Sequence, residues 1–117
     1  MNGQINIYTN LLLKLSKKAL ALGELPISAI IVDPVNKKVI SACINQTKKN
    51  PILHAEINAI LKALKLTNSK RLDKFDLYCS LEPCAMCASA ISLSRVRRVY
   101  FCLEDKKSGG FINGPKL

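Results

Sequence analysis

Apolar and polar positions along the chain follow two different periods, and each change of period marks an expected element. The first apolar positions are spaced as on one face of a helix: Leu11, Leu12, Leu15, Ala19 and Leu22. Lysines occupy the opposite face, and Gly23 follows as a natural end. The pattern therefore predicts an amphipathic helix that ends near residue 23.

A β-hairpin is predicted next, because the apolar, β-branched run 27–32 is followed by the turn signal Asp33–Pro34 and by a second strand-like run, 38–44. Helices are predicted over 54–66 and from Pro83 to about residue 93, since proline is well tolerated at a first helical position. Strands are predicted over 75–81 and 97–103, and the tail from Gly109 shows no period. This order of elements predicts an α/β layered domain with a mixed sheet.

The composition indicates one globular domain that covers residues 1–117. Hydrophobic residues make up 49% and charged residues 22% of the chain, and a domain of this size buries about 65% of its unfolded surface. No apolar run approaches the roughly 20 residues that a membrane span needs. Lysines interrupt the apolar N-terminal stretch, so no signal peptide is predicted and a cytoplasmic location is expected.

The charge balance is strongly basic: 18 Lys and Arg against 8 Asp and Glu give a net charge of +10. Such a surface would attract a polyanion such as RNA. The lysines are scattered, however, and a lysine-rich composition produces the same balance. Charge alone therefore leaves both interpretations open.

Chemistry is indicated by two short motifs, His54-Ala55-Glu56 and Pro83-Cys84-Ala85-Met86-Cys87. Two thiolates at positions i and i+3 of a first helical turn share one face and can hold one metal ion. The chain's single histidine would add a third ligand, and three protein ligands with one open position are typical of catalytic zinc. Glu56, two residues from the histidine, would move protons. H-x-E together with P-C-x-x-C is the known signature of zinc nucleobase deaminases.

The other three of the five cysteines are expected to be small core residues in strands: Cys43, Cys79 and Cys102. An alternative concerns Cys79, because it stands five residues before Cys84 and would complete a structural Cys₃His zinc site. The strand alternation favours a core position for Cys79, and a structural site would leave Glu56 without a role.

With these motifs, the sequence resembles the bacterial tRNA adenosine deaminases, the TadA family. Besides the two motifs, the resemblance covers residues 23–29, Asn45, residues 81–88, and a Ser-Arg and Asp-x-Lys-x-Gly pattern over 94–109. It implies a three-layer α-β-α cytidine deaminase-like fold with a mixed central sheet. It also implies one Zn²⁺ per subunit, held by His54, Cys84 and Cys87, with Glu56 as the catalytic residue.

The implied reaction converts the wobble adenosine of a tRNA anticodon to inosine, with Asn45 and the backbone at Ala55 binding the base. Family members are homodimers, so a homodimer is expected. Ser28 and Cys102 replace glycines of the family pattern, and the chain is expected to be C-terminally shortened, without the family's last strand and helix. Because the zinc motifs fix chemistry rather than substrate, two alternatives remain: a deaminase of a free base or nucleotide, and a non-catalytic zinc-bearing RNA-binding remnant.

Overall fold

In a computed structural model, which describes residues 3–111, three helices and four strands follow one another in the predicted order. They are α1 (Gly3–Ala21), β1 (Ser28–Asp33), β2 (Lys38–Ile44), α2 (Ala55–Thr67), β3 (Asp76–Leu81), α3 (Ala85–Leu93) and β4 (Arg98–Leu103). The strands form one sheet in the order β2-β1-β3-β4. β1 is antiparallel to both of its neighbours, while β3 and β4 are parallel, so the predicted mixed sheet is confirmed.

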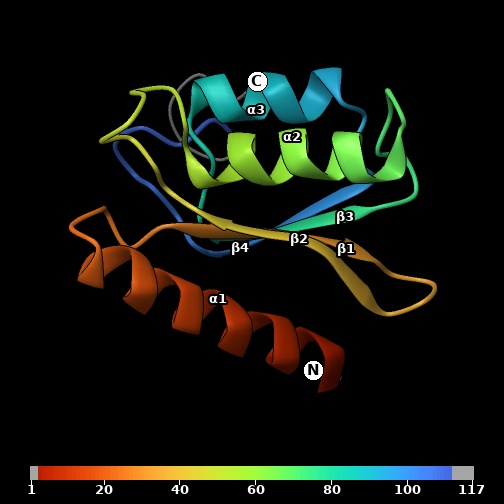
Figure 1. The fold of residues 1–117 in the computed structure, drawn as a ribbon, viewed down its shortest axis with the longest axis horizontal. Helices are drawn as coiled ribbons and strands as arrows, with labels where there is room; N and C mark the ends of the chain where they lie inside the picture. The colour runs from red at the N-terminus through yellow and green to blue at the C-terminus, as the bar shows by residue number, and fades with distance from the viewer. Residues whose placement is uncertain (1–2, 112–117) are drawn as a thin grey trace.

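The sheet is covered on both faces, with α1 on one side and α2 and α3 on the other (Figure 1). β1 and β3 lie at the centre and alternate between two cores. Ala29, Ile31 and Leu77 pack beneath α2 and α3, whereas Ile30 and Tyr78 face α1. This is the three-layer α-β-α arrangement that the sequence predicted. Within the described residues, no helix is long and apolar enough to cross a membrane.

Ser28, which stands where the family pattern has glycine, is completely buried, and both its hydroxyl and its backbone amide make hydrogen bonds. Its hydroxyl donates to the Leu12 carbonyl oxygen at 2.8 Å and lies 2.8 Å from the Ser16 hydroxyl, while its amide donates to Ser80 Oγ at 3.0 Å. A buried hydroxyl without such partners would cost free energy. Ser28 therefore joins α1 to the start of β1 instead of disturbing the strand.

The starts of the two later helices differ from the prediction by one or two residues. We predicted helix from His54 and from Pro83, but α2 begins at Ala55 and α3 at Ala85. His54 (φ −66°, ψ 156°) and Cys84 (φ −70°, ψ 175°) are extended N-cap residues. The side chains of His54 and Cys84 therefore start from the last extended residue before each helix rather than from its first turn. The end of the tail, residues 112–117, lies outside the described residues.

Candidate metal centre and active site

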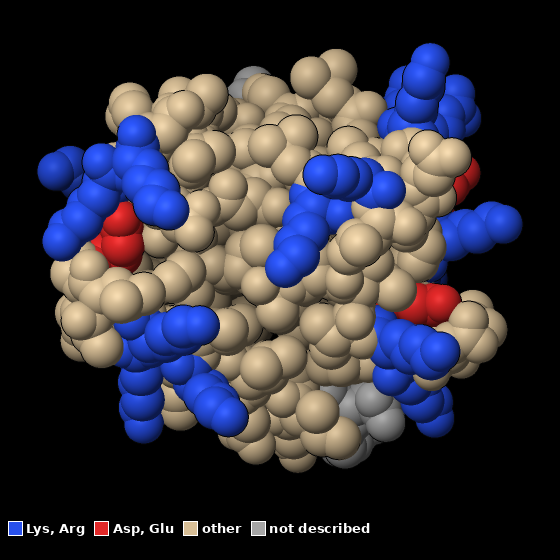
Figure 2. Space-filling model, in the orientation of Figure 1, with Lys and Arg blue, Asp and Glu red and all other residues tan. Residues whose placement is uncertain are grey.

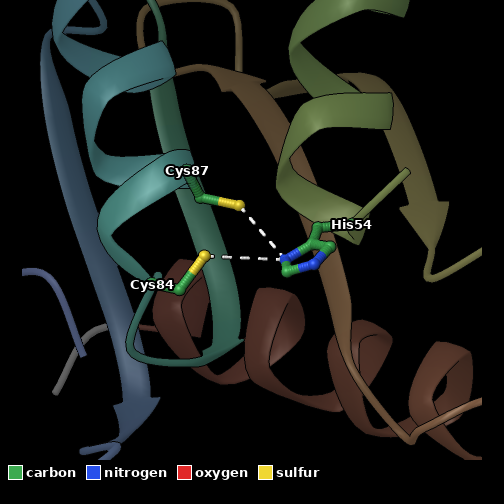
Figure 3. Close-up of side chains that lie close together, drawn as sticks. All are labelled: His54, Cys84 and Cys87. Atoms are coloured by element: carbon green, nitrogen blue, oxygen red, sulfur yellow. Dashed lines mark hydrogen bonds between the residues drawn. The ribbon is translucent and has the colours of Figure 1, made fainter. Parts of the chain in front are cut away.

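His54, Cys84 and Cys87 converge at the N-termini of α2 and α3 (Figure 3). His54 Nδ1 lies 3.6 Å from Cys84 Sγ and 3.6 Å from Cys87 Sγ, and all three donor atoms lie within 4.8 Å of one another. Cys87 is buried and the other two are half-buried. His54 thus forms one compact cluster with two cysteines that lie 30 and 33 residues further along the chain.

The spacing of these donor atoms can be compared with zinc geometry. Zinc binds thiolate sulfur at about 2.3 Å and imidazole nitrogen at about 2.0–2.1 Å, so tetrahedral angles place nitrogen and sulfur about 3.5–3.6 Å apart. Both observed distances are 3.6 Å. The nitrogen and sulfur donors are also the types that zinc prefers. The cluster therefore fits a tetrahedral zinc ion with three protein ligands.

The position of His54 is fixed by the segment between β2 and α2. The segment folds back on itself, because the Gln46 amide donates to the Leu53 carbonyl at 2.9 Å and the His54 amide to the Ile52 carbonyl at 2.9 Å. Asn58 Nδ2 donates to the Ile44 carbonyl at 3.1 Å and so holds the segment against the end of β2. A hydrogen-bonded turn thus holds the backbone of His54 and fixes the position of its imidazole.

Cys79 lies away from the cluster. Its side chain is completely buried in the core beneath α2 and α3, and its thiol donates to the Tyr100 carbonyl oxygen at 3.6 Å. Desolvation by burial raises its pKa well above the usual value, so the thiol stays protonated. The prediction of a core position is confirmed for Cys79, but it is wrong for Cys102, which is exposed, and Cys43 is only half-buried, because both lie on edge strands of the sheet. The alternative of a structural Cys₃His site does not hold among the described residues.

Glu56 is the buried acidic residue beside the metal cluster. Only 3% of its surface is exposed, and its Oε1 has no hydrogen-bond partner among the described residues. Burial raises the pKa of this carboxyl, and hydrogen bonds with its own backbone amide and with Cys87 oppose the shift. A buried carboxylate with a raised pKa and an unused oxygen is suited to accepting and returning a proton.

The Cys87 thiol is also perturbed. Burial raises its pKa far above the usual value, and the neighbouring Glu56 and Cys84 raise it further. The metal-free thiol is therefore protonated at neutral pH. Since zinc requires a thiolate, binding must release this proton.

A cavity of about 240 Å³ opens beside these groups. It is lined by residues from four parts of the chain: Leu25, Ile27, His54, Glu56, Leu81, Glu82, Cys84, Asp105 and Ser108. Sequence reasoning identified His54, Glu56 and Cys84 but assigned no site role to Glu82, Asp105 or Ser108. The Asp-x-Lys-x-Gly pattern and the glutamate directly before Pro83 were the signals that could have indicated them.

Asn45 and Ala55, the two expected base-binding residues, are bonded to each other. The Ala55 amide donates to Asn45 Oδ1 at 2.8 Å, so the Asn45 side chain caps the first residue of α2. Asn45 is 2% exposed and, among the described residues, is not one of those that line the cavity. Their roles toward a base remain predictions.

The fold and the donor cluster define a zinc-binding deaminase domain, and comparison with known families agrees. The model of the cytidine and deoxycytidylate deaminase zinc-binding region matches residues 3–103. The chain therefore belongs to this deaminase family and, within it, to the group of the tRNA-specific adenosine deaminases.

Relatives with the latter name support the placement. The chain is 46% identical over 99 residues to the tRNA-specific adenosine deaminase of Rickettsia bellii, covering 83% of this chain and 68% of that protein. It is 41% identical over 108 residues to that of Bacillus subtilis, covering 91% of this chain and 66% of that protein. The chain thus spans about two thirds of the length of these relatives.

Solved structures give the same picture. A structure from a study of tRNA:A34 deaminases that edit the wobble position superposes with a TM-score of 0.91 and 35% identity, covering 97% of this chain and 88% of that chain. The guanine deaminase of Bacillus subtilis follows with a TM-score of 0.78 and 33% identity, covering 89% of this chain and 66% of that chain. The fold is therefore shared by deaminases of different substrates.

Proposed function

We propose that this chain is a zinc-dependent hydrolase that converts the wobble adenosine of a tRNA anticodon to inosine. The observation that carries the proposal is the cluster of His54, Cys84 and Cys87, spaced for tetrahedral zinc. Beside it lies Oε1 of Glu56, which has no hydrogen-bond partner in the part of the chain that the structure describes. The relatives named tRNA-specific adenosine deaminase support the choice of substrate.

His54, Cys84 and Cys87 would hold one zinc ion per subunit. When bound, zinc supplies Lewis acidity that makes water a nucleophile at neutral pH. Glu56 accepts a proton from that water and delivers protons to the purine ring nitrogen and to the departing amine. A carbon–oxygen bond forms, the exocyclic carbon–nitrogen bond breaks, and one water is consumed for each ammonia released.

The size of the cavity supports a single extruded base as the reacting group. At about 240 Å³ it lies below the roughly 300–1,000 Å³ of sites for drug-sized ligands. Enzymes that react on a base in a nucleic acid turn the target nucleotide out of its stack into such a pocket. Bases in a single-stranded loop, such as an anticodon loop, are open to this recognition.

The remaining RNA would contact the basic surface. Figure 2 shows Lys and Arg side chains dispersed over the viewed face, with few acidic side chains among them. A net charge of +10 would attract phosphates from any direction. The positive surface thus favours RNA over a small neutral base as the partner. Because the lysines are dispersed, they indicate electrostatic attraction of phosphates in general rather than one defined RNA-binding patch.

The chain is proposed to act as a homodimer in the cytoplasm. Large apolar side chains are exposed on the two helices of the site-bearing layer: Leu61, Leu66, Met86 and Leu93. Leu93 is 82% exposed, which is unusual for a side chain that remains in water. A second copy that covers this layer would lie next to the N-termini that carry the metal cluster.

The test is an inosine assay on an anticodon stem-loop with adenosine at the wobble position. Wild type, Glu56→Gln and the exposed control Glu104→Gln would be compared at matched zinc content. We expect inosine from wild type and control, and a loss of at least about 100-fold with Glu56→Gln. Ammonia from free guanine but no inosine would replace tRNA with a free base, the substrate class of the Bacillus guanine deaminase. No turnover of any substrate would support a non-catalytic remnant.

A further inference from the structure

The segment that follows β4, residues 105–111, forms one wall of the catalytic cavity. Asp105 and Ser108 line the cavity together with His54, Glu56 and Cys84. The segment also pairs with the metal-binding motif, because Gly109 forms an antiparallel bridge with Cys84 and the Gly110 amide donates to the Pro83 carbonyl at 2.7 Å. The placement of this wall therefore affects the space available to a substrate.

One buried carboxylate holds both ends of the segment. Glu82 follows β3 directly, is 2% exposed, and its amide extends the β3–β4 ladder by donating to the Leu103 carbonyl at 2.7 Å. Its Oε1 accepts from the Asp105 amide at 3.1 Å, and its Oε2 accepts from the Phe111 amide at 3.1 Å. Both carboxyl oxygens of Glu82 thus accept a hydrogen bond from the backbone of the segment.

The backbone of the segment lies directly on this carboxylate. A Cβ on Gly109 would overlap with the Glu82 carboxyl group. A Cβ on Gly110 would approach both the Ala88 Cβ and the Cys84 carbonyl oxygen to 2.9 Å, closer than real Cβ atoms come. Two consecutive glycines thus allow a close approach that larger residues would prevent.

The segment also has its own internal turn. Asp105 Oδ1 accepts from the Lys107 and Ser108 amides at 3.1 and 3.0 Å, and the Gly109 amide donates to the Asp105 carbonyl at 2.9 Å. These bonds shape residues 105–109 but do not join them to the sheet. Hydrogen bonds connect the segment to the rest of the site through Glu82 and through the backbone of Pro83 and Cys84. The Phe111 ring adds a packing contact, because it lies against the core and stacks on Phe101 with ring centroids 6.4 Å apart.

We propose that Glu82 is a positioning residue of the deaminase, which holds residues 105–111 as the wall of the substrate cavity. The proposal rests on the proposed function for its link to catalysis, but the anchoring itself does not depend on the substrate. In this role Glu82 acts through the backbone amides of Asp105 and Phe111. Its loss should weaken substrate binding more than the chemical step.

The test compares Glu82→Gln with the matched control Glu104→Gln, an exposed glutamate next to the same segment. The amide keeps one acceptor but turns a donor toward the second backbone amide. We expect hydrogen exchange of the amides of residues 105–111 to become at least tenfold faster, with β3 and α3 unchanged. For the anticodon stem-loop, KM should rise at least fivefold while kcat and bound zinc stay within twofold.

A second pair of variants keeps the test independent of folding defects in the β3 region. Gly109→Ala should raise KM in the wild type, whereas in a Glu82→Ala background, where the carboxyl group is gone, it should add little. Additive effects of Gly109→Ala and Glu82→Ala would overturn the proposal. Exchange and KM equal to the Glu104→Gln control would also overturn it, as would loss of protection throughout β3 and β4 with KM unchanged. If wild type fails to act on RNA, the proposed function fails, and hydrogen exchange alone decides the role of Glu82.

Discussion

Asn45 offers a prediction that separates a structural role from a role in substrate binding. Its Oδ1 accepts the Ala55 amide at 2.8 Å in an almost fully buried position. Asn45→Ala removes the acceptor and leaves a buried donor unsatisfied, which costs about 1–3 kcal/mol. We therefore expect the free energy of unfolding to fall by about 2 kcal/mol, and Tm by about 8 °C for a chain of this length.

Asn45→Asp distinguishes the two roles, because it keeps an oxygen that can accept the Ala55 amide but replaces the Nδ2 donor. The carboxylate lies at the N-terminus of α2, where negative charge is favoured. It should recover at least half of the stability that Asn45→Ala loses. If Nδ2 binds the base, activity should not recover, and kcat/KM should stay at least about 100-fold below wild type for both variants, equivalent to about 2.7 kcal/mol.

The assays are urea unfolding of the zinc-loaded protein by circular dichroism and inosine formation on an anticodon stem-loop. The matched pair of substitutions makes the comparison internal, since both alter the same side chain. Recovery of activity together with stability in Asn45→Asp would refute base binding by Nδ2. Asn45 would then act only by capping α2 and so by placing His54.

Three further predictions concern zinc, a tyrosine and an ion pair. Burial raises the pKa of the Cys87 thiol, so zinc binding should release its proton and zinc affinity should rise with pH between 6 and 8; a chelator competition that gives a pH-independent Kd would contradict this. Burial, with Tyr100 and Asp76, raises the pKa of Tyr78 to about 12, so between about pH 10 and 12 the folded state keeps a proton that the unfolded state loses. The free energy of unfolding should therefore fall over this pH range, and urea titrations of Tyr78→Phe should show a smaller fall. Asp76→Asn breaks a bidentate ion pair with Arg97, whose nitrogens lie 2.7 and 2.8 Å from the carboxylate oxygens, and because the Arg97 side chain is 38% exposed the free energy of unfolding should fall by about 1 kcal/mol in urea. The kcat should stay unchanged, since the pair lies at the end of β3 away from the metal ligands.

The sequence predicted the order of elements and the metal cluster because both depend on local patterns. The helical and strand periods of the chain reflect which faces are buried, and in β1 every second residue packs into the opposite core. The zinc motif is equally local, since Cys84 and Cys87 are three residues apart. Only His54 had to be brought from elsewhere, and the N-termini of two neighbouring helices bring it.

Other features could not be predicted, because they depend on contacts between distant residues. Asn45 appears in the sequence as a polar residue after a strand, and nothing local indicates that it caps a helix that begins ten residues later. His54 and Cys84 were expected inside helices, since the motifs contain no signal for an extended residue before each helix. That single extended residue matters, because it places each ligand at the N-terminus of its helix, where the donor atoms of His54 and Cys84 face each other.

Residues 105–111 illustrate the same limit at the cavity wall. The stretch carries part of the Asp-x-Lys-x-Gly pattern but no hydrophobic period, so no helix or strand is predicted there. Nothing in the sequence around Glu82 predicts that its side chain is buried. In the structure Gly109 lets the backbone of the segment approach the buried Glu82 side chain closely, and Gly110 lets it approach Ala88 and Cys84. The Glu82 carboxyl oxygens then accept hydrogen bonds from backbone amides of the segment. A periodicity argument detects residues that pack on a core, whereas most of this wall is held by hydrogen bonds from its backbone to one buried side chain. The proposed wall of the substrate cavity is therefore a part of the site that hydrophobic patterning does not reveal.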